Sequence, residues 1–324
     1  MKKSAEVVII GGGISGLSTA YNLAHMGCKD VVLLEKNSLY SGSTGRCAAG
    51  VRQQFGLEMN CRLAKGACEI LENLNELLDY EGDIEFKQGG YLWLLNTDEE
   101  VEVYKKSVQL QNSLGIESRL ITVEEALKIV PYLNPEEIKA CTFHQKDGHA
   151  NPFQVSQAYA EAAKRLGVEI NTSTEVIDIR VKNNCIVEVI TDKGRIATNK
   201  VLNAAGAFAK DIGRMVGVEL PLKPERHQIL ATEPVEPLLS PMVISTEFSC
   251  QQEPQGSFLM AYGDPSEPER KDIYSSWEFM EEMAKRICKI LPILSNIKVV
   301  RQWAGSYTMT PDVAPILGSV AVTI

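Results

Sequence analysis

The stretch VVIIGGGISG, residues 7–16, decides the fold of this chain. Four apolar residues lead directly into three glycines, a pattern typical of a strand that is buried on both faces and then turns sharply. Apolar residues recur at helical spacing over residues 14–26, and a second apolar stretch, VVLLE, ends at Glu35. Strand, turn, helix and strand make a βαβ unit, which predicts a parallel, doubly wound α/β sheet.

The glycines of this turn have the GxGxxG spacing of a dinucleotide site. The first permits the tight turn, the second lets backbone approach a pyrophosphate, and the third lets helix pack on strand. The N-terminus of the following helix favours an anion, and an acidic residue about 20 positions further on suits a ribose hydroxyl rather than a 2′-phosphate. These signals predict FAD or NAD, bound by Gly11, Gly13, Ile14, Ser15, Gly16, Glu35 and Lys36.

The rest of the chain alternates helical and β patterns. Capping boxes at Thr97 and Thr122 predict two helix starts, and Pro152 suits the first turn of a third helix. We expect one long amphipathic helix over residues 58–80, a strand at 91–95, a meander over 168–202 that returns to the parallel sheet, and a helix over 274–290. A doubly wound domain interrupted by a more antiparallel one is predicted.

Composition limits the partners. The 324 residues carry a net charge of −9, which disfavours a nucleic-acid partner, and no apolar run approaches the ~20 residues that span a bilayer. The N-terminus shows no signal-cleavage pattern, so a cytoplasmic protein is expected. The 8 cysteines form no CxxC pair. We therefore expect reduced thiols and no metal site.

Three further stretches resemble the FAD-dependent family of D-amino-acid oxidase, glycine oxidase and sarcosine oxidase. They are GSTGRCAAGVRQQFG at residues 42–56, VLNAAGAFA at 201–209 and WAGSYTMTPDVAPILG at 303–318. The first looks most like the β-subunits of heterotetrameric sarcosine oxidase and of L-proline dehydrogenase. The resemblance implies a Rossmann-like, glutathione-reductase-like FAD-binding domain (residues 1–85, 141–215 and 300–324) with an inserted α+β substrate domain on a mixed or antiparallel sheet (86–140 and 216–299).

The resemblance also implies how FAD is bound. Hydroxyl groups would reach phosphate or ribityl oxygens, an arginine would balance the pyrophosphate, and small residues would leave room for the flavin ring. These residues are Ser43, Thr44, Arg46, Ala49, Gly50, Val51, Ala205, Gly206 and Gly305. Val176 resembles a residue of the family strand whose backbone brackets adenine, with a plain core residue as the alternative. The usual covalent anchors of the family are replaced by Cys47 and Gly305, so a non-covalent flavin is expected. Some β-subunits also hold FMN at the subunit boundary, for which no residues can be named here.

For the substrate, the resemblance points to Arg52 and Tyr307. Arg52 aligns with the arginine that binds a substrate carboxylate, and Tyr307 with an active-site tyrosine. A surface arginine and a core tyrosine remain the alternatives. None of the four histidines is assigned as a base. The implied reaction is hydride transfer from a C–H beside nitrogen to flavin N5, which gives an imine that hydrolyses.

The expected protein is thus the β-type catalytic subunit of a complex that oxidises a small, secondary amino acid, with an α-type subunit as partner. The absence of a lysine near residues 256–265 favours a dehydrogenase over an oxidase. Alternatives are a free-standing glycine or D-amino-acid oxidase, a 2-hydroxy-acid flavoenzyme, and a non-catalytic FAD-binding scaffold. In the resembled family the C-terminal motif is followed by a further segment at the flavin. A chain ending at Ile324 is therefore expected to hold the isoalloxazine poorly.

Overall fold

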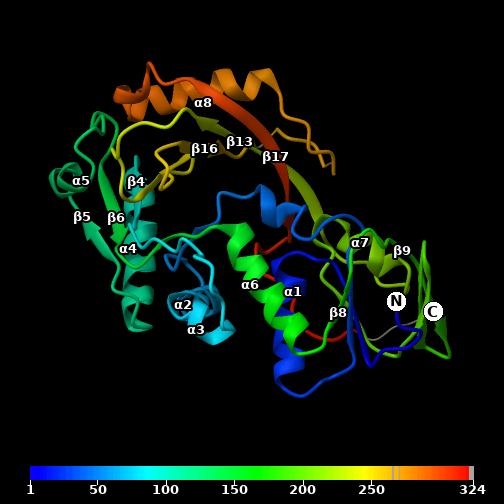
Figure 1. The fold of residues 1–324 in the computed structure, drawn as a ribbon. Helices are drawn as coiled ribbons and strands as arrows, with labels where there is room; N and C mark the ends of the chain where they lie inside the picture. Colours follow the sequence, from blue (N-terminus) through cyan, green and yellow to red (C-terminus); the bar gives the residue numbers. More distant parts are fainter. Residues whose placement is uncertain (265, 270, 321–324) are drawn as a thin grey trace.

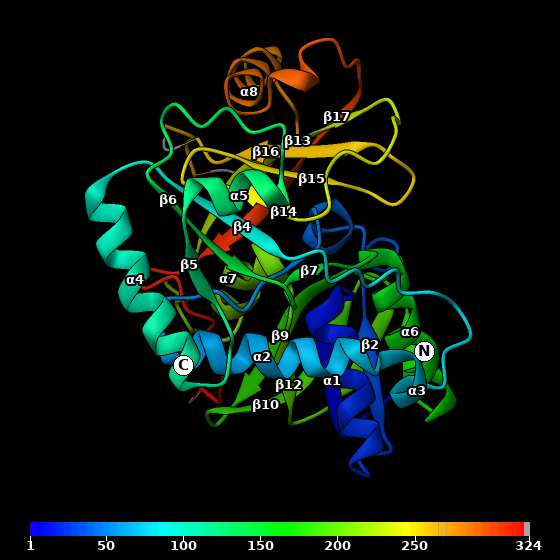
Figure 2. The same cartoon turned by 90° about the vertical axis from the view of Figure 1, so that its left-hand side faces the viewer.

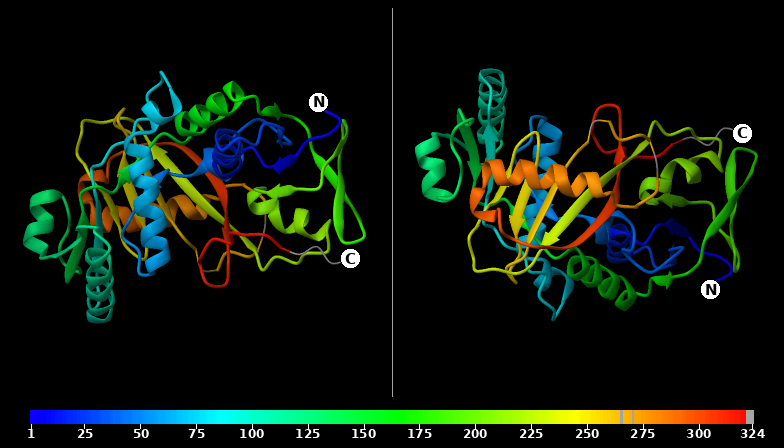
Figure 3. Two further views of the ribbon diagram at one scale, coloured as in Figure 1. Left: turned by 90° about the horizontal axis from the view of Figure 1, so that it is seen from below. Right: turned by 90° about the horizontal axis from the view of Figure 1, so that it is seen from above.

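The computed structural model describes residues 1–264, 266–269 and 271–320. Figure 1 shows a molecule with two main sheets, which are linked by long loops and by the strand β17. Helices α4 and α5 lie at one end of the molecule and the strand β9 at the other, as Figure 3 shows from below and from above. Apart from three helices that are introduced below with the sheets they cover, the helical elements are η1 (Ser43–Arg46), α2 (Glu58–Glu72), α3 (Leu74–Leu78), α4 (Asp98–Ser113), α5 (Val123–Ile129), η2 (Gly206–Phe208), α7 (Ala209–Arg214) and η3 (Pro292–Leu294).

The first sheet is parallel throughout. Its order is β12 (Val201–Asn203), β1 (Val7–Ile10), β2 (Val31–Leu34) and β8 (Glu169–Asn171). Alternate residues of β1 face opposite sides. Val7 and Ile9 pack with α1 (Ile14–His25) and α6 (Pro152–Arg165), whereas Val8 and Ile10 pack with the antiparallel strands β9 (Val176–Lys182), β10 (Cys185–Thr191) and β11 (Gly194–Ala197). Burial on both faces explains the unbroken apolar run, and the predicted parallel sheet is confirmed, although the face opposite α1 and α6 is covered mainly by antiparallel strands rather than by long helices.

The second sheet has eight strands of mixed direction. Their order is β17 (Val299–Met309), β13 (Lys223–Thr232), β16 (Phe258–Tyr262), β15 (Ser249–Gln252), β14 (Met242–Ile244), β4 (Tyr91–Leu95), β6 (Ala140–His144) and β5 (Arg119–Ile121). Figure 2 shows α8 (Trp277–Ile290) over β13, β15 and β16. Its buried Phe279, Met283 and Ile287 share one core with the strands. The fold is therefore the expected mixed α/β arrangement of a parallel sheet beside a mixed one.

Most of the predicted helix starts are confirmed, and one helix was predicted too long. Both capping boxes form, and the Asn151 side chain caps the helix that begins at Pro152. The helix predicted over residues 58–80 is instead divided at Asn73, whose φ of −121° is not helical. The Asn73 side chain donates to the Glu69 carbonyl oxygen, a local bond that competes with helix continuation. The last helix begins at residue 277, after the capping residue Ser276.

Sheet membership bears on the predicted domain division, which itself stays a prediction. Strands β6 and β17 hydrogen-bond inside the eight-stranded sheet, although the sequence placed residues 141–144 and 300–309 with the FAD-binding part. Residues 321–324 lie outside the described residues. The segment β17 thus belongs to the large sheet by pairing and reaches the smaller sheet through its loop contacts.

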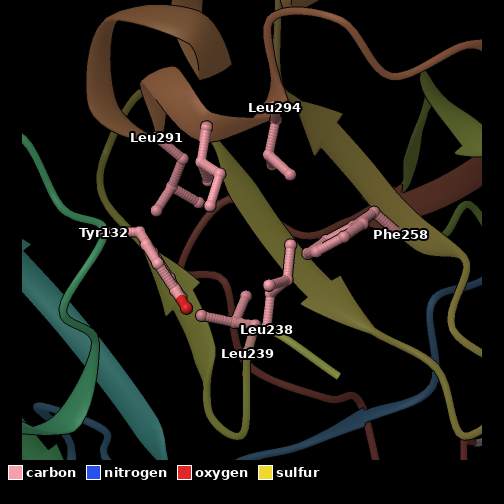
Figure 4. A pocket seen from close by; sticks show the side chains of 7 residues that line it. Tyr132, Leu238, Leu239, Phe258, Leu291 and Leu294 are labelled. Atoms are coloured by element: carbon pink, nitrogen blue, oxygen red, sulfur yellow. The ribbon is translucent and has the colours of Figure 1, made fainter. Parts of the chain in front are cut away.

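The structure also bears on the cysteines, on membrane-spanning helices and on internal cavities. All eight cysteines are free thiols. Within the described residues, no helix combines the length and the apolar character needed to cross a membrane. The structure has a small apolar cavity of about 10 Å³, and Figure 4 shows side chains around it, among them Leu291 and Leu294 around η3 and Phe258 on β16 of the large sheet. A cavity of that size holds one water at most, and no predicted site residue lines it.

Candidate active site

The turn at residues 11–16 allows no side chain at two of its glycines. Gly11 has φ +113°, and a Cβ there would lie 2.2 Å from the Ala204 carbonyl oxygen. A Cβ on Gly16 would lie 2.0 Å from the Gly11 carbonyl oxygen. The first glycine thus lets β1 approach the end of β12, and the third lets α1 sit directly on the turn, as the sequence predicted.

The N-terminus of α1 is arranged for an anion. Its N-cap, Gly13, supplies no side-chain cap, and the first turn carries no acidic residue. The Ile14 N–H donates to Thr44 Oγ1 over 3.1 Å, so η1 lies against this terminus. Ser15 is exposed beside it. The other N–H groups of this first turn, together with the neighbouring hydroxyl, form a suitable cradle for a pyrophosphate.

The carboxylate at the end of β2 is held in place by backbone. Glu35 accepts from the Gly12 N–H and from the Asn37 N–H, each over 2.8 Å. Lys36, next along the chain, places its ammonium group 3.2 Å from the centre of the Phe208 ring, beside η2. The carboxyl ends of β2 and β12 therefore meet at one edge, which is where parallel sheets bind ligands.

Three further residues were predicted to bind the cofactor near this edge. Ala205 and Gly206 lie at the edge, whereas Val176 does not. The Ala205 N–H is held by Asn203 Oδ1, and Gly206 turns the chain with φ +53°. The Val176 side chain is buried in the core beneath the parallel sheet, among residues that include Val8. Any contact of Val176 with adenine would have to come from its backbone, and that role stays a prediction.

The 3₁₀ turn η1 connects the two sheets. Ser43 Oγ donates to the Ser306 carbonyl oxygen over 2.6 Å, and the Trp303 indole N–H donates to the Arg46 carbonyl oxygen over 3.0 Å. A Cβ on Gly305 would come within 3.0 Å of Arg46 Cβ. Residues 43–46 are thus fixed between the N-terminus of α1 and β17.

Residues 47–55, which we call the strap, follow η1 and lead to the predicted substrate residue. Ala49 has φ +47°. The short strand β3 (Gly50–Val51) then pairs with β7 (Gly148–His149). A Cβ on Gly50 would lie 1.8 Å from the Tyr91 hydroxyl oxygen, so any larger residue at position 50 would have to displace this phenol. The strap therefore lies directly against β4.

Arg52 lies in an aromatic cage on the strap. Its guanidinium carbon is 4.4 Å from the centre of the Phe55 ring and 5.2 Å from that of Trp93. Tyr104 packs on Trp93, and burial raises the pKa of Tyr104 to about 12 against the opposing charge of Arg52. Among the described residues, no Asp or Glu forms an ion pair with Arg52. A planar cation that is stacked but unpaired is well suited to bind a carboxylate.

The buried phenol of Tyr91 lies near both predicted substrate residues, Arg52 and Tyr307. Burial raises the pKa of Tyr91, the positive charge of Arg52 opposes that rise, and Tyr307 is close enough to contribute. Tyr307 itself is 56% exposed. Its ring lies 4.1 Å from that of His227, centre to centre. Arg52 and Tyr307 therefore border the same region.

His227 is a member of this region to which the sequence assigned no role. Burial lowers the pKa of His227, and the nearby Glu225 carboxylate, 3.3 Å from Nε2, opposes that shift. Phe55, Tyr91 and Trp93 were also missed as neighbours of the site. The motif YLWLL predicted a strand, but its strand pattern does not reveal which side chains meet the strap.

Comparison with known proteins agrees with this geometry. The family model described as "FAD dependent oxidoreductase" matches residues 6–323. The chain belongs to this family. The family expected from the sequence is confirmed, and with it the enzyme class, an FAD-dependent oxidoreductase of the amino-acid and amine type.

Three individual relatives show which members of the family this chain is similar to. The solved structure of L-proline dehydrogenase from P. horikoshii is 38% identical, with a TM-score of 0.93 over 99% of this chain and 86% of that one. Sarcosine oxidase subunit beta of Rhodobacter capsulatus is 29% identical over 99% of this chain and 78% of its own length. Mitochondrial dimethylglycine dehydrogenase of Rattus norvegicus is also 29% identical, but this chain spans only 39% of its length.

Proposed function

We propose that this protein oxidises the C–N bond of a small secondary amino acid, with Arg52 as the residue that binds the substrate carboxylate. The observation that carries the proposal is the guanidinium of Arg52, which lies between Phe55 and Trp93 and forms no ion pair within the part of the chain that the structure describes. An amino-acid carboxylate would complete its ion pair. Proline and sarcosine, which appear in the names of two relatives, are both secondary amino acids.

The residues at the edge of the parallel sheet fit FAD. Gly11, Gly13 and Gly16 would admit the pyrophosphate, Thr44 would bind it beside the N-terminus of α1, and Glu35 would bind the ribose. The bound flavin would supply the redox chemistry by accepting a hydride, that is two electrons and one proton, from the donor carbon. With release of the N–H proton to solvent, the donor C–N bond would become C=N, and water would hydrolyse this imine.

We further propose that the flavin is bound without a covalent link. At Gly305, a side chain would crowd Arg46. Cys47 is exposed, and its thiol lies 3.1 Å from the Thr44 carbonyl oxygen, consistent with a local hydrogen bond. A flavin-sized mass increase on the denatured protein would contradict this part of the proposal. The comparisons lend no support to FMN, and it is not proposed as a cofactor.

A β-type subunit role follows from the similarity to sarcosine oxidase subunit beta. We propose an α-type partner chain and an electron acceptor other than oxygen. Eight free thiols are consistent with a reducing compartment such as the cytoplasm. Co-expression with the candidate partner and co-purification would test the assembly directly.

The reaction is tested by anaerobic titration of the FAD-loaded protein. L-Proline, sarcosine, glycine, D-alanine and a 2-hydroxy acid are added in turn while the visible flavin absorbance is followed. The proposal expects proline or sarcosine to bleach the flavin at the lowest concentration. Bleaching by the 2-hydroxy acid alone would contradict the C–N assignment. No bleaching by any of them, with full reduction by dithionite, would favour a non-catalytic scaffold.

A further inference from the structure

The strap is held at three places by residues far along the chain. Gln251 Nε2 donates to the Ala48 carbonyl oxygen over 2.8 Å. Strand β3 pairs with β7 in the middle. At the far end, the Gln53 N–H donates to Asp147 Oδ1 over 2.8 Å. Arg52 is the residue between the second and third of these attachments.

Asp147 makes the third attachment with a completely buried carboxylate, whose residue is 0% exposed. Its second oxygen, Oδ2, accepts from Gln54 Nε2 over 3.0 Å. The Asp147 carbonyl oxygen also accepts from the Gly90 N–H, so this residue joins the strap to the start of β4. One side chain therefore fixes two consecutive strap residues, both of which follow Arg52.

The glutamines bound by Asp147 continue into a buried polar network. Gln54 Oε1 accepts from Thr142 Oγ1 over 2.8 Å, and Gln54 Nε2 also donates to the Tyr91 carbonyl oxygen. Gln53 Nε2 lies 3.3 Å from His144 Nε2. Buried networks of this kind specify a single arrangement of the backbone, because breaking one bond leaves a buried group unsatisfied.

We propose that Asp147 is a positioning residue, which orients Arg52 for the substrate carboxylate by anchoring Gln53 and Gln54. The inference rests on the proposed function and deepens it. Asp147 makes no contact with substrate in this account. It acts through the backbone on the C-terminal side of Arg52, while the β3–β7 pair holds the N-terminal side.

The electrostatic surroundings agree with this role. Burial raises the pKa of Asp147, and this rise is opposed first by the nearby His144, then by the hydrogen bonds that Gln54 and Gln53 donate to the carboxylate, and then by the charge of Arg52. The carboxylate is thus stabilised by the same groups that it positions. Removing the Asp147 carboxylate would leave the Gln53 N–H without this acceptor and would take one acceptor from Gln54 Nε2, and burying a hydrogen-bond donor without an acceptor costs free energy.

The test compares Asp147→Asn and Asp147→Ala with wild type. Asparagine keeps an acceptor for the Gln53 N–H but sets an amide donor against Gln54, whereas alanine keeps neither bond. Hydrogen exchange over residues 50–55 is expected to quicken in both variants. Calorimetry with tetrahydrofuran-2-carboxylate, an unreactive proline analogue, is expected to show affinity reduced about 10–100-fold in Asp147→Ala and less in Asp147→Asn. The neutral carboxamide is expected to bind all forms alike.

Two comparisons separate positioning from general damage. Asp83→Asn is the matched control, because Asp83 also accepts a backbone N–H, that of Glu85, but is exposed and outside the strap. It is expected to leave carboxylate affinity unchanged. In a double-mutant cycle, Asp147→Asn should add little to the loss caused by Arg52→Lys. In turnover assays, KM should rise more than kcat falls.

The outcomes are distinct. Faster exchange with unchanged carboxylate affinity would overturn the positioning role, as would unchanged exchange or fully additive losses with Arg52→Lys. Asp147→Asn guards against an alanine variant that fails to fold, and its thermal unfolding is recorded alongside. A wild-type protein that binds neither analogue contradicts the proposed function itself. A wild type that binds and a variant that binds equally contradict only the role of Asp147.

Discussion

The turn at residues 11–16 and the strap at residues 47–55 are held in different ways. The turn depends on backbone: Gly11 and Gly16 are needed because carbonyl oxygens lie where a Cβ would be. The strap depends on side chains that come from elsewhere, chiefly Asp147 and Gln251. A substitution in the turn should therefore affect cofactor binding and folding together, whereas one around the strap should affect substrate affinity while the flavin stays bound.

The largest effect is expected at Gly11. Alanine there combines a positive φ with a Cβ 2.2 Å from a carbonyl oxygen, so we expect about 1–3 kcal/mol of overpacking beyond the conformational cost. Gly27→Ala is the control, because it has φ +100° with open space around it. Urea unfolding and FAD titration measure both variants. Equal stability losses would show that close approach at Gly11 does not matter.

Glu35→Gln should weaken FAD without unfolding the protein. The carboxylate accepts two backbone N–H groups and is proposed to accept from the ribose. Loss of charge-assisted hydrogen bonds corresponds to roughly 10–100-fold in affinity. Fluorescence titration measures the affinity for FAD, and calorimetry with tetrahydrofuran-2-carboxylate measures the affinity of the substrate site for comparison. A loss of tetrahydrofuran-2-carboxylate affinity with FAD binding intact would contradict the assignment of Glu35 to the cofactor and of the strap to the substrate.

Tyr307→Phe sharpens the other side of the comparison. It keeps the ring against His227 and removes only the hydroxyl. If that hydroxyl donates to the substrate carboxylate, KM should rise by about 2–10-fold. FAD affinity should not change. Steady-state kinetics with the best amino-acid donor decide this, and an unchanged KM would leave Tyr307 as a packing residue.

The smallest effect concerns pH and His227. Burial lowers its pKa below the ordinary 6.5. A depressed folded-state pKa contributes stability above pH 6.5 that is lost as the pH falls through the folded value. As the pH is lowered from 7 into the acidic range, the free energy of unfolding should therefore fall more for the wild type than for His227→Gln. Thermal unfolding at several pH values measures this difference, and parallel curves would contradict it.

The two regions also explain what the sequence could predict. The residues of the turn keep a fixed spacing along the chain, so Gly11, Gly16 and Glu35 could be named from that spacing, even though the backbone that Gly11 approaches, at Ala204, lies far along the chain. The anchors of the strap are separated from it by 94 residues for Gln53 and Asp147, and by 203 for Ala48 and Gln251. No periodicity reports such pairs. Similarly, the apolar pattern continues past Asn73, and therefore the helix break there was not visible.

Arg52 is a single residue that illustrates this limit of prediction from the sequence. A resemblance identified it, but its surroundings depend on how β4 lies against the strap, which sets Trp93 near the guanidinium. The sequence thus predicted the residue and not the cage. Phe55 alone, three positions along the chain, was within local reach.

The division of labour between the two regions is tested most directly by one anaerobic titration of wild type and Arg52→Met, each loaded with FAD. We expect a secondary amino acid to bleach the wild-type flavin. We expect the variant, with full flavin content, to need at least about 100-fold more donor for the same bleaching and still to be reduced by dithionite. Equal bleaching of the two proteins by the same donor concentration would contradict the role of Arg52 in binding the substrate carboxylate.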